Sequence, residues 1–125
     1  MLNSASLVSF VATARPEAAR QFYEVVLGLV LLEDTPFALV FNSNGTTLRV
    51  QKVQQISPAP YTALGWAVSD VRSTVHALVA KGVVFQRFES LSQDALGIWQ
   101  SPSGAKVAWF CDPDGNTLSL TESAT

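Results

Sequence analysis

The chain has 125 residues, the size of one ordinary domain that can bury a hydrophobic core. Hydrophobic residues make up 48% of the sequence and charged residues 14%, which excludes intrinsic disorder. The eight Lys and Arg residues are scattered, so we expect no nucleic-acid partner, and no apolar run is long enough to cross a membrane. With a formal net charge of only −2, copies of the chain repel one another weakly, and we expect a homodimer.

The first ten residues, MLNSASLVSF, lack the basic start and the long apolar stretch of an export signal. The only cysteine, Cys111, has no second cysteine with which to form an internal disulfide. A reducing, cytoplasmic location is the simplest expectation from these two features.

The first part of the chain, about residues 5–53, predicts a β-α-β-β-β module. Pro16 suits a first helical turn and Gly28 a helix end, so the segment between them predicts a helix over 17–27. Its expected buried face consists of Ala18, Ala19, Phe22, Val25 and Val26. The strands are expected at 7–13, 29–32, 37–41 and 46–53, and the last two are joined by the hairpin signal Asn44-Gly45.

The same pattern returns after a proline-containing connector at 54–60 and runs over about 61–123. A strand at 61–68 precedes a helix that Asp70 caps and Gly82 ends. The expected buried face of this helix consists of Val71, Val75, Leu78 and Val79, and strands are expected at 83–88, 105–111 and 117–121. An insert at 89–103, with an extra strand at 97–100, is the best candidate for a mobile lid or a dimer contact. The repetition indicates a duplicated module within a single α+β domain of residues 1–125.

Alternation along the strands sorts their side chains between two faces of the sheet. Leu48 and Val50 lie opposite Thr47, Arg49 and Gln51. In the same way Leu118 and Leu120 oppose Thr117, Ser119 and Thr121, and Leu64, Trp66 and Val68 oppose Ala63, Gly65 and Ala67. The bulky face should pack under the helices. The other face carries small residues rather than the long polar side chains of a wet surface, and this favours a concave binding surface over a face that is simply solvated.

Two segments resemble the signatures of a known superfamily. They are Phe22-Tyr23 followed by Leu27-Gly28, and the run from Trp109 to Asn116 followed by Leu118 and Leu120. The chain is similar to the vicinal oxygen chelate superfamily, which includes glyoxalase I, extradiol dioxygenases, and fosfomycin- and bleomycin-resistance proteins. The resemblance covers nearly the whole chain. It implies two βαβββ modules forming a curved sheet around a cleft, with the helices outside.

The same resemblance places the four metal-ligand positions of the superfamily at Val8, Arg49, Ala63 and Ser119. None of these is a customary ligand for a divalent metal, and Arg49 would place a fixed positive charge beside the ion. The single histidine, His76, lies on the second helix, away from its apolar face. We therefore expect neither a metal nor another cofactor, and metal-dependent lyase or dioxygenase chemistry is not favoured.

The candidate ligand-binding residues are Arg49, Phe10, Trp109, Thr47, Ser119 and Ala63. Arg49 must meet a ligand carboxylate or phosphate, solvent, or an internal partner such as Glu33, Asp34 or Glu122. Phe10 and Trp109 are either aromatic walls of the site or core residues, whereas Trp66 is expected in the core and Trp99 to pack.

No general base or activated nucleophile can be nominated, because Cys111 has no histidine to activate it. The Asp112-Pro113-Asp114-Gly115 segment is explained by a tight turn and lacks the residues of a calcium loop. The sequence thus favours metal-free binding of a small organic molecule. A metal-independent isomerase or lyase, and a dimeric protein whose cleft only mediates protein contacts, are the alternatives.

Overall fold

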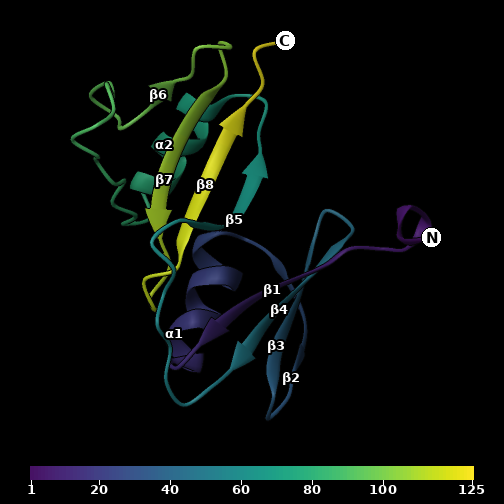
Figure 1. The fold of residues 1–125 in the computed structure, drawn as a ribbon. Helices are drawn as coiled ribbons and strands as arrows, with labels where there is room; N and C mark the ends of the chain where they lie inside the picture. The colour runs from purple at the N-terminus through teal and green to yellow at the C-terminus, as the bar shows by residue number, and fades with distance from the viewer. The chain divides into compact units, whose positions relative to one another are not determined.

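The computed structural model describes all 125 residues, which divide into two compact units, 1–58 and 59–125. Each unit holds one four-stranded sheet and one main helical segment (Figure 1). This is the α+β fold of two repeated modules that the sequence predicts. No helix is both long enough and apolar enough to cross a membrane.

The first unit contains a short 3-10 helix (Leu2–Ser4), β1 (Val8–Thr13), α1 (Pro16–Arg20), a π-helix (Gln21–Val26), β2 (Val30–Asp34), β3 (Ala38–Ser43) and β4 (Thr46–Lys52). Its strand order is β1-β4-β3-β2, with β1 parallel to β4 and the other pairs antiparallel. Asn44 and Gly45 both have positive φ, 48° and 89°, as a two-residue hairpin turn requires. The Asn42 side chain accepts a hydrogen bond from the Gly45 N–H at 2.9 Å, so the predicted hairpin is confirmed.

The first helical segment differs from the prediction in its second half. After α1 the chain widens into the π-helix, in which the Leu27 N–H donates to the Phe22 carbonyl, five residues back. A π turn contains more residues than an α turn, so the side chains that follow are rotated relative to the expected face. Ala19 and Tyr23 are fully buried, whereas Val25 is 52% exposed. The expected place of Val25 in the core is therefore wrong, and Tyr23 fills the core instead.

The second unit contains β5 (Thr62–Ala67), α2 (Val71–Val79), β6 (Trp99–Gln100), β7 (Lys106–Cys111) and β8 (Thr117–Glu122). Its strand order, β5-β8-β7-β6, is that of the first unit with every number raised by four, and the one parallel pair is again first with last. Asp70 caps α2 by accepting a hydrogen bond from the Ser73 N–H at 3.1 Å. The duplication inferred from the sequence is thus present in the topology of both sheets.

The predicted strand over 83–88 is wrong. Only one isolated bridge forms there, between Phe85 and Phe110 of β7. The Phe88 N–H donates instead to the Gln93 side chain at 2.7 Å, because the chain turns into the insert at this point. The short β6 from the insert occupies the sheet edge beside β7. On α2, Val71, Val75 and Leu78 are buried as expected, but Val79 at its end is 50% exposed.

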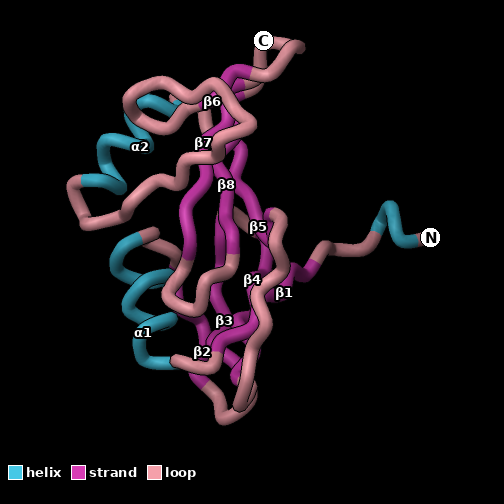
Figure 2. Tube along the Cα trace, turned by 60° about the vertical axis from the view of Figure 1, so that its left-hand side comes forward, coloured by secondary structure: helices cyan, strands magenta, loops and turns pink.

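The alternation predicted along the strands is confirmed in both units. Leu48 and Val50 of β4 are buried, while Thr47 and Arg49, which alternate with them, are only half-buried. In the second unit the buried set on the helix side is Ala108, Phe110, Leu118 and Leu120. Contacts join α2 to both β7 and β8, and Figure 2 shows this helix on one side of those strands. The opposite side of each sheet, called the open face below, carries the small and polar side chains.

One cluster of charges in the first unit predicts a pH effect. Asp34 accepts from Lys52 Nζ at 2.6 Å and from Arg20 at 3.1 Å, and the hydrogen bond from Lys52, with the charges of both cations, lowers the pKa of the Asp34 carboxyl below 3.8. A depressed pKa in the folded state means that this carboxylate stabilises the fold at and above pH 3.8 and loses that contribution as pH falls through the folded value.

We therefore expect Asp34→Asn to lower the melting temperature at pH 7 by more than at acidic pH. Thermal unfolding of both proteins across this range measures the difference. An equal loss at all pH values would contradict the role of the Asp34 charge.

Candidate functional site

The open face of the first sheet brings together three of the predicted site residues. Phe10 of β1 is paired in register with Arg49 of β4, and Val8 with Thr47. Phe10 is 57% exposed, and Arg49 and Thr47 are half-buried. Phe10 is thus not a core residue of this unit. The face presents an aromatic ring, a guanidinium and a hydroxyl next to one another.

Arg49 has no ion-pair partner within the chain. The three acids considered from the sequence are engaged elsewhere or do not reach it: Asp34 pairs with Arg20 and Lys52, Glu122 pairs with Lys106, and Glu33 forms no ion pair. Since a guanidinium cannot lose its charge near neutral pH, the open face of this sheet keeps an available cation.

The open face of the second sheet is built around Ser119 of β8. Ser119 lies in register between Gly65 of β5 and Trp109 of β7 and is only 8% exposed, and its hydroxyl forms no hydrogen bond within the chain. Ala63 is exposed and stands in β5 at a β-bulge between Thr62 and Leu64. The bulge was not predicted from the sequence. Trp109, Ser119 and Ala63 are thus brought together on one sheet.

Gly65 keeps room for the Ser119 hydroxyl. A Cβ atom at position 65 would lie 2.5 Å from Ser119 Oγ, too close for two non-bonded atoms. We expect Gly65→Ala to destabilise the wild-type chain, because the serine hydroxyl must leave its position. In a Ser119→Ala background the same change should stabilise by about 0.4–1 kcal/mol, through the reduced freedom of the unfolded chain. Urea unfolding of the four proteins gives this coupling, and additive effects would show that the two side chains do not meet.

Trp109 forms a wall of a pocket of about 480 Å³ that lies wholly within the second unit. The main lining residues are Tyr61, Gln86, Phe88, Leu91, Trp109 and Thr117. The Phe88 ring packs edge-on against Trp109 at a centroid distance of 5.3 Å, and Trp99 lies 6.1 Å away, tilted by 36°. No charged side chain lines this pocket. The rings of Tyr61, Phe88 and Trp109, together with a few hydroxyl and amide groups, suit a largely apolar ligand.

Gln86 and Cys111 lie beside Trp109 on the same face. The Gln86 N–H donates to the Trp109 carbonyl at 2.8 Å, and Gln86 Nε2 donates to Cys111 Sγ at 3.0 Å. Burial raises the pKa of the Cys111 thiol above 9.0, against an opposing hydrogen bond from Thr117. The protonated thiol is therefore favoured at neutral pH, and a thiol is a poorer nucleophile than a thiolate.

The insert shapes one wall of the pocket and is internally hydrogen-bonded. The side chain of Gln93 accepts from the Phe88 N–H and donates to the carbonyls of Gln86 and Gly97 at 2.9 and 2.8 Å. Arg87 donates to the carbonyls of Gln93 and Asp94. These contacts define the loop that carries Phe88 and Leu91, so part of the expected lid is a structured wall of the pocket.

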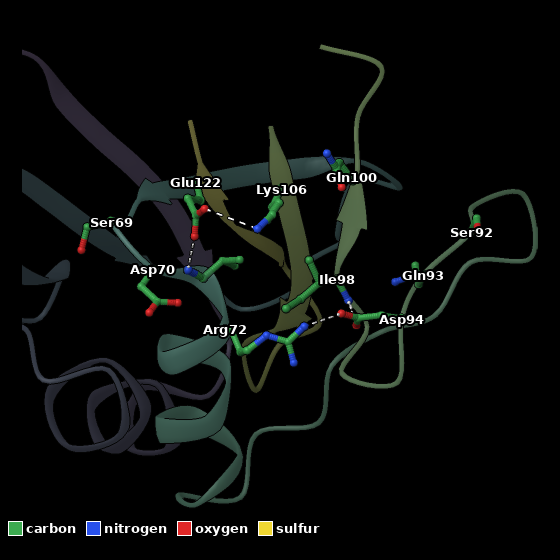
Figure 3. A pocket seen from close by; sticks show the side chains of 11 residues that line it. Ser69, Asp70, Arg72, Ser92, Gln93, Asp94, Ile98, Gln100, Lys106 and Glu122 are labelled. Atoms are coloured by element: carbon green, nitrogen blue, oxygen red, sulfur yellow. Dashed lines mark hydrogen bonds and ion pairs between the residues drawn. The ribbon is translucent and has the colours of Figure 1, made fainter. Parts of the chain in front are cut away.

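A larger pocket of about 720 Å³ opens at the start of α2 (Figure 3). Its charged side chains are already engaged: Arg72 pairs with Asp94 at 3.3 Å, Lys106 pairs with Glu122 at 3.8 Å, and Asp70 accepts from the Ser73 N–H. Glu122 also accepts from the Val71 N–H at 2.9 Å, and Asp94 accepts from the N–H groups of Leu96 and Ile98. These acids already accept hydrogen bonds from backbone N–H groups nearby. The smaller aromatic pocket is therefore the better candidate for the functional site.

Sequence reasoning found Trp109 but missed most of its neighbours in the pocket. Tyr61 and Gln86 were taken only as parts of strands, and Phe88 as the end of one. The insert was the one available signal, since a loop of that length in the second module points to a function. The other residues that line the pocket with the insert could not be predicted, because the hydrogen bonds that position them leave no local pattern in the sequence.

The residues at the superfamily's metal positions do not fit a metal. Val8 and Ala63 carry no donor atoms, Arg49 is a cation, and the Ser119 hydroxyl would be the only donor of the set. No group of three or more His, Cys, Asp or Glu residues in the chain is arranged to hold an ion.

The repeated βαβββ topology defines a class of paired-module proteins, and sequence comparison places the chain within it. The family model for the Glyoxalase/Bleomycin resistance protein/Dioxygenase superfamily matches residues 5–120. The chain belongs to this superfamily. No curated protein sequence matches it.

Solved structures share the fold over almost the full chain. TnmS3, an antibiotic binding protein from Streptomyces sp. CB03234, is 26% identical with a TM-score of 0.76, and 98% of each chain is covered. A superfamily member from Sphaerobacter thermophilus is 22% identical with a TM-score of 0.76, covering 98% of this chain and 100% of that one. Lactoylglutathione lyase from Agrobacterium tumefaciens is 18% identical with a TM-score of 0.76, covering 97% and 95%.

Proposed function

We propose that the chain binds a small planar organic molecule in the pocket beside Trp109, without a metal. The observation that carries this proposal is the uncharged, aromatic lining of a pocket of about 480 Å³, a volume in the range of small-molecule sites. A flat ligand would stack on the indole of Trp109, with Ser119 and Ala63 on the same sheet. The similarity to an antibiotic binding protein supports binding rather than turnover.

Arg49 is proposed to bind a negatively charged group of a ligand. It carries a permanent charge with no internal partner, and Phe10 and Thr47 flank it on the same face of the first sheet. Arg49→Ala should weaken anionic ligands and leave uncharged ligands unaffected. Equal effects on both classes would remove this role.

A thermal-shift panel of planar aromatic compounds, with and without an anionic group, tests the proposed function. A ligand at 100 times its Kd stabilises the folded state by about 2.7 kcal/mol, which raises the melting temperature of a domain of this size by several degrees. The shift should be the same with and without EDTA. If no compound shifts the wild-type protein, the binding proposal fails. Conversion of a bound compound to a product would instead assign the chain to the metal-independent isomerases or lyases.

We further propose that the chain is a cytoplasmic homodimer. The low net charge and the exposed side chains of Val8, Phe10 and Val30 on the first unit favour association with a second copy, and the single free Cys111 suits a reducing compartment. Sedimentation velocity should give twice the chain mass of 13.4 kDa. A monomer at all concentrations would exclude the dimer.

A further inference from the structure

The aromatic pocket contains one polar atom that lacks a partner. Gln86 Oε1 is buried and accepts no hydrogen bond in the ligand-free chain, and Gln86 is one of the residues that line the pocket. Leaving a buried carbonyl oxygen without a donor is unfavourable, so such groups are rare and call for an explanation. The rest of the residue is well held, by its backbone bond to Trp109 and by Nε2 to Cys111.

The two side chains that are hydrogen-bonded to Gln86 do not supply a donor for this oxygen. Cys111 already receives Nε2 of Gln86 and the hydroxyl of Thr117, while the amide of Gln93 is used on the carbonyls of Gln86 and Gly97. Turning the Gln86 amide by 180° would give its oxygen to the Cys111 thiol and leave its nitrogen unpaired. One end of the amide therefore lacks a partner in either orientation.

We infer that Gln86 is a specificity-determining residue, whose amide oxygen accepts a hydrogen bond from an O–H or N–H group on the edge of a planar aromatic ligand. This inference rests on the proposed function, because it concerns the same pocket. A ring stacked on Trp109 would lie next to Gln86, because the backbone N–H of Gln86 is hydrogen-bonded to the carbonyl of Trp109. Because the oxygen is buried in the ligand-free chain, the amide must rotate for the oxygen to reach the ligand edge. The ligand class is thus a neutral phenol, a lactam or a similar flat molecule with a donor.

A matched pair of probes separates this hydrogen bond from stacking. At pH 6, 7-hydroxycoumarin is mostly neutral and carries one donor, and 7-methoxycoumarin replaces that hydrogen with a methyl group. Calorimetric titration of the wild-type protein should show about three- to tenfold tighter binding of the hydroxyl compound, the usual contribution of one hydrogen bond. In Gln86→Met, which keeps the side-chain length but removes the amide, the two probes should bind equally.

Gln100→Met is the matched control, because Gln100 lines the larger polar pocket and not the aromatic one. This variant should keep the wild-type preference. A preference that persists in Gln86→Met, or equal binding of both probes by the wild-type protein, overturns the role of Gln86 while leaving the binding function in place. Binding of neither probe overturns the proposed function and this inference together.

The stability of the ligand-free variant gives a second measurement that needs no probe. Gln86→Met removes the unpaired buried oxygen together with the hydrogen bond from Nε2 to Cys111 Sγ, so the melting temperature of the variant should change little. A fall of several degrees would show that the amide is satisfied in the free protein, and the inference would be wrong.

Discussion

Replacing Trp109 with Ala is expected to weaken the binding of 7-hydroxycoumarin by about 2 kcal/mol, or roughly thirtyfold in Kd. The indole lines the aromatic pocket and contacts the rings of Phe88 and Trp99 at centroid distances of 5.3 and 6.1 Å. Its removal takes away the stacking surface and lets water into the site. Calorimetric titration of the variant measures the loss.

Trp109→Phe is the control for this prediction. A phenyl ring keeps a flat apolar face, so binding should fall only a few-fold. Circular dichroism spectra must show that both variants are folded. If Trp109→Ala binds the coumarin as tightly as the wild-type chain, the ligand does not stack on this residue, and the aromatic pocket is not the site.

Replacing the next residue, Phe110, with Ala is expected to reduce the free energy of unfolding by about 3–5 kcal/mol. Phe110 is fully buried on the helix side of β7, 5.4 Å from the ring of Phe85. A cavity there removes apolar contacts on the helix side of the sheet. The lost free energy is a large part of the total stability of a small domain. Urea unfolding followed by circular dichroism measures the change.

Val84→Ala is the matched control, since Val84 is in the same region but 82% exposed, and its replacement should change stability by no more than about 0.5 kcal/mol. A loss of less than about 1 kcal/mol for Phe110→Ala would mean that this face of β7 is not packed. Trp109 and Phe110 are adjacent in β7, yet the first substitution should mainly weaken ligand binding and the second should mainly lower stability. The reason is that Trp109 faces the ligand pocket and Phe110 faces the core.

Features that depend on neighbouring residues could be predicted from the order of the amino acids. Strand alternation placed Arg49 opposite Leu48 and Val50, and Ser119 opposite Leu118 and Leu120. Local turn chemistry correctly gave the Asn44-Gly45 hairpin and the Asp70 cap. These follow because the period of a strand and the hydrogen bonds of a turn or cap involve residues that lie within a few positions of one another.

Two features depend on contacts between distant parts of the chain: the π turn that buries Tyr23 and exposes Val25, and the absence of a regular strand over residues 83–88. That segment has the composition of a strand, yet Gln93 binds the Phe88 N–H, and Gln86 pairs with Cys111, 25 residues away in the sequence. The aromatic pocket and its unpaired amide oxygen depend on these contacts between residues that are far apart in the sequence. Each backbone group has several possible partners, and the favoured one depends on which side chains the whole fold brings within reach.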